Sequence, residues 1–567
     1  MFRVAFILGI AMVAPSSAPA QQRDTMPERN ALPRDVAVEV VGLFNATTAL
    51  RSFDPTTIDS GRTVVGDVAV LNGPITIAGH VTGRVLAINA DVLLVRGARI
   101  DGDLIVVGGE IDGADAATIR GEIRTYRPPL RYTQEADRLV VQLGGVEDDQ
   151  WWRRLERHGR RNFNRLEVAN AGAYNRVEGL PVRVGPVLYR DQGWGHLRFG
   201  AAAIVRSASS FTGSSPDVGH DVSSELRVGR EFGVTIGARL FNMVEGVEQW
   251  QLSDLEVGLA NFLFHRDYRD YYGRHGGQLQ AALRATDNAD LTLSYGDERW
   301  SSRTEHDPFT LFKNDLPWRV NPAMDDGRFH VAKLTLRLDT RNDAFNPLAG
   351  WYLLADFERG AGHIDRFAPT SSGITEPATG PTRYQRGFFD LRRYNRLAPS
   401  SSLNMRLVLG GWLSGDALPL QRRLSIDGPA TVPGFDFRVT GGTDVGTCGT
   451  EIPLPGRPAQ CDRIALTQLE YRSDIRLSFT DGRDGLRRTR FRADGEWVFF
   501  ADAGRGWLVN SPGSVLNYAR RELPALSTYR TDIGGGLDFD QFGIYLAKAL
   551  SVPSEPVNIF LRVRHRF

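Results

Sequence analysis

The residues of this chain that could do chemistry are few and scattered. Its ten histidines include no His-Glu-x-x-His pair, the spacing that holds a metal ion beside a general base. No Gly-x-Ser-x-Gly sequence places a nucleophilic serine on a strained turn. The densest polar run, Asp-Tyr-Arg-Asp-Tyr-Tyr at residues 267–272, is interpreted as an aromatic segment at an interface or a lumen rim; a nucleophile beside its base is the alternative. The sequence therefore favours a protein without catalytic residues, metal ligands or cofactor.

Two smaller groups of reactive residues are given structural interpretations. The only cysteines, Cys448 and Cys461, fall in one predicted loop, where we expect a disulfide; two free thiols are the alternative. Four aspartates could suggest calcium, but their spacing differs from the nonapeptide calcium repeat, and solvated corners are preferred: Asp67, Asp101, Asp103 and Asp112.

Composition limits the partners and the architecture. The 68 Lys and Arg residues nearly balance the 67 Asp and Glu residues, which gives no support for nucleic acid as a partner. With 567 residues, the chain is expected to form two or more units. Abundant glycine, 60 residues, and 10% aromatic residues are typical of many strands joined by tight turns.

The first 20 residues have the pattern of a cleaved secretory signal. Arg3 precedes a short apolar run, and Ala18 and Ala20 form a small-x-small cleavage site, so the mature chain is expected to begin at Gln21. No later stretch is apolar for the ~18 residues that a membrane helix needs. If the exported chain enters a membrane, it must do so as a closed barrel, because only helices and barrels satisfy their backbone groups in lipid.

An internal repeat occupies residues 60–125, after an N-terminal segment at residues 21–59. Four coils begin with glycines separated by 17, 19 and 19 residues: Gly66, Gly83, Gly102 and Gly121. An apolar residue stands two positions before each one: Val64, Val81, Ile100 and Ile119. Alternate residues such as Val68 and Val70, or Leu104 and Val106, are expected to point inward, so that stacked coils share one core. A run of ordinary β-hairpins is the alternative.

This repeat resembles the bactofilin-like polymer-forming β-solenoid. The resemblance implies a scaffold or interaction module with possible self-association. Residues 126–171 are expected to form a linker, in which Trp151 and Trp152 stand beside a basic cluster. These tryptophans suit a membrane interface, or equally a solvated helix packed on the solenoid.

Residues 172–567 are predicted to form an antiparallel transmembrane β-barrel of about sixteen strands, which makes the fold all-β. Segments near ten residues alternate polar and apolar side chains, as in residues 331–340. In the last strand, residues 558–567, one face is expected to carry Ile559, Leu561, Val563 and Phe567. The other face, with Arg562, Arg564 and Arg566, would look into a wet lumen. Such a strand resembles the C-terminal signal of bacterial outer-membrane barrels.

Several phrases, in order along the chain, are similar to the bacterial surface antigen family, the barrel shared by BamA- and TamA-type proteins. They are Asp-Thr-Arg-Asn-Asp-Ala-Phe-Asn-Pro at residues 339–347, Phe-Ala-Asp-Ala-Gly at residues 500–504 and Gly-Gly-Gly-Leu-Asp-Phe at residues 534–539. Residues 174–180 resemble the opening strand of related barrels. The resemblance implies a lumen loop with a Val-Arg-Gly-Phe motif, for which this chain has Val432, Pro433, Gly434 and Phe435 within residues 416–462. The arginine is missing, and Arg438 is its suggested substitute.

BamA- and TamA-type proteins carry POTRA modules before the barrel, and here the solenoid is expected in that place. The resemblance implies an outer-membrane protein that assembles or translocates proteins or lipids without catalysis, with its N-terminal domain in the periplasm. Its expected partners are outer-membrane lipid, the barrel-assembly machinery for its own insertion, and client proteins or lipids. The alternatives are a barrel-anchored structural protein, a passive pore, and a barrel enzyme of the phospholipase or protease type.

Overall fold

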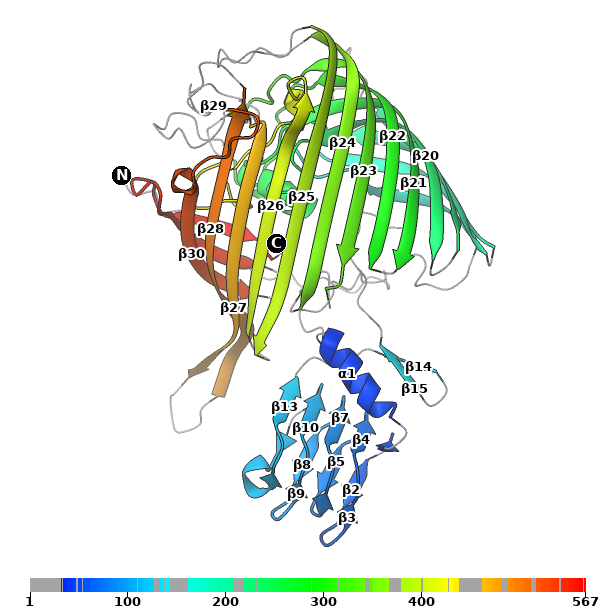
Figure 1. The fold of residues 1–567 in the computed structure, drawn as a ribbon, viewed down its shortest axis with the longest axis vertical. Helices are drawn as coiled ribbons and strands as arrows, with labels where there is room; N and C mark the ends of the chain where they lie inside the picture. The colour runs from blue at the N-terminus through cyan, green and yellow to red at the C-terminus, as the bar shows by residue number, and fades with distance from the viewer. Residues whose placement is uncertain are drawn as a thin grey trace.

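In the computed structural model, the protein forms two β units, a solenoid and a barrel (Figure 1). The structure describes residues 32, 34–46, 49–53, 55–109, 111–126, 130, 132–135, 138–141, 162–192, 194–208, 218–229, 232–286, 288–313, 317–341, 347, 349–366, 379–398, 401–426, 428–437, 461–481, 488–510, 517–539, 542–563 and 565–567. The predicted signal at residues 1–20, Trp151, Trp152 and Arg564 lie outside the described residues. No helix among the described residues is long and apolar enough to cross a membrane.

The solenoid has three parallel sheets, one on each side of every coil. The first sheet contains β1 (Leu50–Ser52), β4 (Val68–Leu71), β7 (Val85–Ile88), β10 (Leu104–Val107) and β13 (Ile123–Tyr126). The second contains β2 (Thr56–Ile58), β5 (Ile75–Ile77), β8 (Val92–Leu94) and β11 (Ile111–Asp112). The third contains β3 (Thr63–Val64), β6 (His80–Val81), β9 (Arg99–Ile100) and β12 (Thr118–Ile119), and a 3₁₀ turn, η1 (Ala114–Ala116), lies between β11 and β12.

The observed register is the one that the repeat predicts. Val68 pairs with Val85, Val85 with Leu104, and Leu104 with Ile123, so each coil stacks on the equivalent residues of the next. The repeated glycine is needed because consecutive coils approach closely there. A Cβ on Gly83 would lie 2.4 Å from the carbonyl carbon of Gly66, which is far inside van der Waals contact. The solenoid prediction is confirmed.

The three central strands of the first sheet, β4, β7 and β10, are buried on both faces. Val68 and Val70 point into the solenoid core, as predicted. The opposite face packs under the helix α1 (Arg34–Phe44), where Val40 and Phe44 are fully buried. Burying such side chains stabilises the fold by roughly 1.5–3 kcal/mol each. The N-terminal segment and the repeat therefore form one unit, which begins before residue 60.

A short hairpin in the predicted linker also docks on this unit. It consists of β14 (Tyr132–Glu135) and β15 (Arg138–Val141). The Asn45 side chain donates to the Leu139 carbonyl at 2.8 Å and accepts from the Leu139 N–H at 2.9 Å. This two-way contact fixes the hairpin beside the end of α1.

Sixteen antiparallel strands form the barrel, as predicted, and a two-residue strand, β29 (Asn517–Tyr518), runs parallel beside β28. In the first half are β16 (Phe163–Asn170), β17 (Pro181–Asp191), β18 (Gly195–Arg206), β19 (Val218–Val228), β20 (Gly233–Gly246), β21 (Tyr271–Thr286), β22 (Ala289–Ser302) and β23 (Asp326–Asp339). In the second half are β24 (Gly350–Arg366), β25 (Gly380–Ala398), β26 (Ser401–Gly415), β27 (Arg463–Asp481), β28 (Arg488–Val509), β30 (Arg530–Phe539), β31 (Gly543–Ala549) and β32 (Asn558–Arg562).

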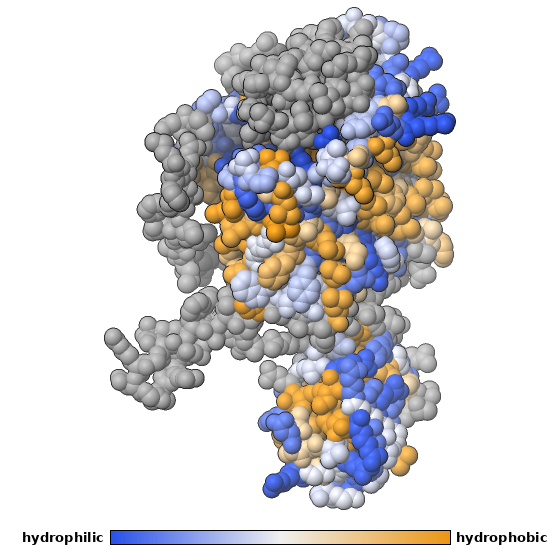
Figure 2. Space-filling view, turned by 60° about the vertical axis from the view of Figure 1, so that its left-hand side comes forward, coloured by the Kyte–Doolittle hydropathy of each residue, from blue (hydrophilic) through white to orange (hydrophobic). Residues whose placement is uncertain are grey.

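The barrel strands alternate between an apolar outer face and a charged inner face. In β23, Leu334 and Leu338 are exposed outside, whereas Arg337 is buried inside and pairs with Asp290 of β22. Figure 2 shows apolar side chains gathered over the barrel wall and hydrophilic side chains toward its upper end. This alternation is what a strand between lipid and a wet lumen requires.

The two ends of the barrel differ in their connections. Strand pairs meet at one end through short turns, such as residues 192–194 and 229–232, and at the other through long segments, such as residues 247–270 and 416–462. The long segments include the helix α3 (Asp254–Phe264) and two 3₁₀ turns, η2 (Leu420–Arg422) and η3 (Leu526–Thr528). The chain enters β16 at the short-turn end, and in Figure 1 the solenoid lies below that end.

The first barrel strand lies inside the predicted linker. β16 begins at Phe163, whereas the sequence places the barrel boundary at residue 172. Leu166 and Val168 point outward, with the shorter polar side chains of Asn164 and Asn170 on the same face. This mixed face weakens the alternation that identifies a lipid-facing strand, so the boundary predicted from the sequence lies after the true start of the barrel.

Candidate functional site

The segment that follows β26, from Asp416 to Phe437, lies inside the barrel. Leu424, Ile426, Val432 and Phe435 are buried. They form one cluster with inward side chains of five barrel strands: Phe388, Val408, Ile464, Leu466, Leu508 and Ala549. This packing holds the segment, called here the lumen loop (residues 416–437), against the inner wall.

Gly434 brings the lumen loop into direct contact with the wall. Its N–H donates to Asp532 Oδ2 of β30 at 2.5 Å. A Cβ at this position would lie 2.7 Å from the Ala549 nitrogen and 2.7 Å from the Asp532 Cβ. Both neighbours belong to paired strands that have little freedom to move, so the close approach requires glycine.

The other motif residues also contact the wall. The Pro433 carbonyl accepts from the Asn558 side chain of β32 at 3.1 Å. The Phe435 ring lies 4.5 Å from the guanidinium carbon of Arg530. Arg438, the suggested substitute for the missing motif arginine, lies outside the described residues.

Arg566, which the sequence places on the lumen face of the last strand without naming its partners, pairs with an acidic residue of the wall beside the lumen loop. Arg566 is 2% exposed and pairs with Asp502 of β28. Its guanidinium carbon lies 3.7 Å from the centre of the Phe500 ring. Its Nη1 is also 3.8 Å from the Glu470 carboxylate of β27. The signal that places it on the lumen face is the alternation of arginines in the last strand.

The lumen loop and the last residues of the chain each contact one of two neighbouring carboxylates in the barrel wall. Asp502 and Asp532 are directly opposite each other on β28 and β30. Like charges in this position repel each other. The Arg566 guanidinium offsets the repulsion at Asp502, and the Gly434 N–H does so at Asp532. The lumen loop is therefore joined to the terminal segment (residues 563–567) through two adjacent wall residues.

The terminal segment differs from the predicted last strand. β32 ends at Arg562, with Ile559 and Leu561 exposed on its outer face, as predicted. Phe567 is buried, with its ring 6.4 Å from that of the inward-facing Tyr394, and it does not share the outer face. The prediction that Phe567 continues that face is wrong, whereas Val563, which directly follows β32, is only partly buried. The reason is that Arg562 and Arg566 both find carboxylates inside the barrel, which turns the chain inward.

Arg562 ties the end of β32 to α3. Its Nε lies 2.6 Å from Glu256 Oε1, and both side chains are buried. Its Nη1 donates to the Pro429 carbonyl of the lumen loop at 3.3 Å. Breaking a buried ion pair by removing one partner costs about 3–5 kcal/mol, because the remaining charge stays buried. The end of β32 is thus held from inside.

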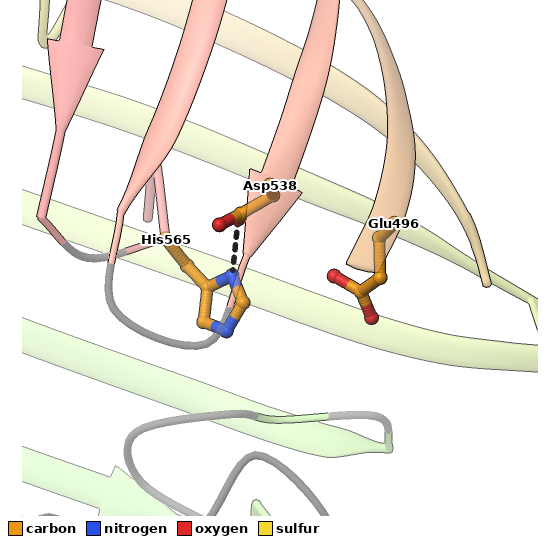
Figure 3. A group of neighbouring side chains, drawn as sticks. All are labelled: Glu496, Asp538 and His565. Carbon is orange, nitrogen blue, oxygen red and sulfur yellow. Dashed lines mark ion pairs between the residues drawn. The ribbon is translucent and has the colours of Figure 1, made fainter. Parts of the chain in front are cut away.

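A group of three side chains beside the terminal segment has a composition that could hold a metal ion. Single ligand atoms of Glu496, Asp538 and His565 lie within 4.8 Å of one another, from β28, β30 and the terminal segment (Figure 3). His565 Nδ1 is 3.3 Å from Asp538 Oδ2. However, the Arg472 guanidinium already donates to both carboxylates. A cation therefore already occupies the place that an ion would take.

Cys461 ends the long connection after β26, two residues before β27 begins, and it is buried in the cluster of the lumen loop. Cys461 is disulfide-bonded, and the Cys461 backbone forms a bridge with Leu424 of the lumen loop. The one other cysteine of the sequence, Cys448, lies outside the described residues.

The first and last strands are the two ends of the barrel sheet. Among the described residues, hydrogen-bonded strand order runs from β16 to β32, and no pairing joins these two strands. β32 has only five residues, whereas β27 has 19 and β28 has 22. The boundary between β16 and β32, called here the seam, therefore leaves one backbone edge of each strand without a strand partner.

A polar cavity of about 310 Å³ lies between the lumen loop and the inner wall formed by strands β20 to β25. Its lining includes acids and bases from the wall and the loop, among them Glu245, Arg274, Glu298, Glu358 and Arg422. Arg422 of the loop pairs with Glu358 of β24 at 2.8 Å. The loop thus fills part of the lumen and leaves a charged space beside it.

The polar run at residues 267–272 is buried and does not form an exposed girdle. Asp267 and Asp270 pair with Arg176 at 2.9 and 3.1 Å, and all three are almost completely buried. The Tyr271 hydroxyl donates to Asp267 at 3.1 Å. These contacts tie the turn between β16 and β17 to the start of β21, at the long-segment end of the barrel. The run is therefore not an exposed girdle, and its position agrees with the other interpretation, a segment at the lumen rim. The arrangement is an ion-pair network that fixes the first strands.

No protein-family model and no curated protein matches the chain. Solved structures similar to it include BamA from Haemophilus ducreyi lacking POTRA domains 1–3, at 12% identity and a TM-score of 0.40. That match covers 76% of this chain and 79% of the BamA chain. BamA and the CdiB proteins below are outer-membrane barrels of the Omp85 family.

CdiB from Escherichia coli is similar at 10% identity and a TM-score of 0.31, over 76% of this chain and 66% of that one. CdiB from Acinetobacter baumannii is similar at 13% identity and a TM-score of 0.28, over 70% of this chain and 59% of that one. BamA is one of the proteins that the sequence resemblance names. At these identities the likeness concerns the fold.

Proposed function

We propose that this protein works in the bacterial outer membrane, where it assembles or translocates proteins or lipids by admitting a client at the seam. The observation that carries the proposal is the pair of unpaired edges on β16 and β32. An exposed strand edge offers backbone N–H and C=O groups to which an extended chain can add as a further strand. The process needs displacement and pairing of strands, and no catalytic residue.

Contacts inside the barrel also link the last strand of the seam to the lumen loop and to α3. Asn558 and Arg562 of β32 reach Pro433 and Pro429 of the lumen loop, and Arg562 also reaches Glu256 of α3. A movement of the loop would therefore pull on the last strand. The solenoid, connected at the short-turn end, would then lie in the periplasm after export by the predicted signal.

Two experiments in series test this proposal. Inner and outer membranes are separated first, and the protein is run on gels with and without heating; an outer-membrane location and a heat-shifted band are expected. The protein is then depleted, and other outer-membrane barrels and surface lipids are quantified. Levels of at least one client class should fall and recover with the wild-type gene. A soluble protein, or an unchanged outer membrane, would contradict the proposal.

A barrel-anchored scaffold is the second candidate, favoured by the ends of the solenoid. The end strands β1 and β13 each pair on one side only, and Leu50 and Ile123 are exposed there. A second copy could stack on such an end by continuing the parallel sheets. Concentration-dependent oligomers of the intact protein, lost in a Leu50→Lys, Ile123→Lys variant, would favour this candidate.

A passive pore is the third candidate, favoured by the charged cavity beside the lumen loop. It predicts conductance in planar bilayers that rises when residues 416–462 are deleted. Unchanged conductance in a variant that still shifts on heating would exclude it.

A further inference from the structure

The helix α3 has a polar buried face and an apolar exposed face. Ser253 caps its first turn, accepting from the Glu256 N–H at 3.3 Å, while Glu256 accepts from the Ser253 N–H at 3.2 Å. The buried residues are Glu256, Val257 and Asn261. Soluble helices usually bury the apolar face, so the opposite arrangement needs an explanation.

One end of α3 contacts the last strand. Glu256, in the first turn, pairs with Arg562 at 2.6 Å and accepts from the Val563 N–H at 3.3 Å. Because Glu256 also closes the capping box, the position of the helix terminus and the end of β32 are fixed together.

Val257, next to Glu256, and Phe262 at the other end of α3 contact the segment that follows the first strand. Val257 packs in one cluster with Ala173. The Phe262 ring lies 5.7 Å from the Tyr174 ring. Ala173 and Tyr174 follow directly on β16, which ends at Asn170. Glu256 and Val257 are consecutive residues, so the first turn of α3 already contacts both sides of the seam.

The exposed face of α3 is an apolar stripe at helical spacing. Leu255, Leu259 and Phe262 follow one another at intervals of four and three residues; Leu255 and Phe262 are about 40% exposed, and Leu259 between them is partly buried. Phe309 and Phe312 of the next long connection extend the stripe, being 64% and 61% exposed and in ring contact with Phe262 and Phe264. Apolar patches of this kind mark a surface that meets a partner or a membrane.

Both strands beside the seam carry exposed apolar residues on their outer faces. Leu166 of β16 is 71% exposed, and Ile559 of β32 is 70% exposed. The stripe on α3 would make these two outer faces continuous. We propose that α3 fills the seam between β16 and β32 and turns its stripe, Leu255, Leu259 and Phe262, toward lipid acyl chains. The surface is a lipid-contact surface, and α3 must leave before a client enters.

This inference rests on the proposed membrane location, and the experiment separates the two. Phe262→Cys and, independently, Leu255→Cys are labelled with a nitroxide in the full-length protein, reconstituted in phosphatidylcholine vesicles. Cys461 is disulfide-bonded and does not compete for the label. Relaxation of each label is measured with oxygen, which concentrates in acyl chains, and with a nickel chelate, which stays in water. Heat-shifted bands confirm that each variant folds.

Two matched labels give the reference values. Ile559→Cys reports an outward position on β32, and Phe53→Cys reports a solenoid residue of similar exposure to Phe262. Oxygen preference at residues 255 and 262, within about twofold of that at residue 559, is the expected result. Nickel preference like that at residue 53 would place the stripe in water and overturn the inference while leaving the barrel intact. Nickel preference at residue 559 as well would overturn the membrane location too.

Discussion

The guanidinium of Arg566 lies over the ring of Phe500, 3.7 Å from its centre. The same guanidinium pairs with Asp502, two residues further along β28. Since Asp502 stands opposite Asp532, which accepts from Gly434 of the lumen loop, one short chain of contacts joins the terminal segment to the loop. A substitution in this chain of contacts is therefore expected to change the stability of both the terminal segment and the lumen loop.

Replacing Arg566 should release the terminal segment. Arg566→Ala leaves Asp502 buried beside Asp532 without its cation, which is expected to cost about 3–5 kcal/mol locally. Hydrogen exchange of peptides covering residues 558–567 should rise at least a hundredfold in the intact protein. The double variant Arg566→Ala, Asp502→Asn should exchange more slowly than Arg566→Ala alone, because the stranded charge is gone. Equal exchange in wild type and Arg566→Ala would refute the role of this contact.

An arginine at residue 433, the position at which the motif of the resembled family has one, should compensate for the loss of Arg566. Pro433 adjoins Gly434, whose N–H contacts Asp532, so an arginine at residue 433 has the acidic pair within reach. Pro433→Arg is expected to lower the exchange of residues 558–567 in the Arg566→Ala background by about tenfold. In the wild-type background it should bring little gain, because Arg566 already occupies the site. Pro433→Gln is the matched control; if it rescues equally well, charge is not the cause.

The architecture could be predicted from the sequence because the patterns that indicate it, the glycine spacing and the polar–apolar alternation, are periodic. The glycine spacing of the solenoid gives the strand register, since a Cβ at Gly83 has no room against Gly66. The alternation in residues 331–340 gives the two faces of β23, since Arg337 needs Asp290 and Leu334 needs an apolar surface. Regular spacing survives in a single sequence because every repeat meets the same steric and solvation demand.

The candidate site could be predicted only in part, because its contacts join residues that are far apart in the chain. Nothing local links Arg566 to Asp502, or Arg562 to Glu256, which is 306 residues away. The alternation of Arg562 and Arg566 correctly indicates an inward face, but it gives no sign that the strand stops at Arg562. Their carboxylate partners decide where the chain turns, and those partners are set by the tertiary fold.

A side chain at residue 434 should displace the lumen loop. Gly434→Ala puts a Cβ 2.7 Å from the backbone nitrogen of Ala549, and overpacking of this kind costs about 1–3 kcal/mol. The temperature at which the unheated gel band shifts should fall, and conductance in planar bilayers should rise. Gly172→Ala is the control, because its Cβ would meet only the Pro181 Cγ, at 3.8 Å. The same effect from both variants would show that the contact at Gly434 is unimportant.

Solenoid stability should depend on pH through the ion pair between Asp67 and Arg84. Asp67 accepts from the Arg84 side chain at 2.7 Å and from the Arg84 N–H at 2.8 Å, and the side-chain hydrogen bond holds the pKa of Asp67 below its ordinary value of 3.8. A carboxyl whose pKa is lowered by folding stabilises the folded state above the unfolded pKa, and this contribution is lost as the pH falls through the folded pKa. Both side chains are partly exposed, so about 1 kcal/mol is expected at neutral pH.

Hydrogen exchange of residues 82–90 in the intact protein measures this contribution. At pH 7, Asp67→Asn should exchange about fivefold faster than wild type, the change that 1 kcal/mol produces. At a pH below the lowered pKa of Asp67, wild type and variant should exchange alike, because the wild-type carboxyl is then protonated. Asp115→Asn, at an exposed position in η1, should match wild type throughout. A difference between Asp67→Asn and wild type that persists unchanged into acid would assign the effect to packing, since protonation would then make no contribution.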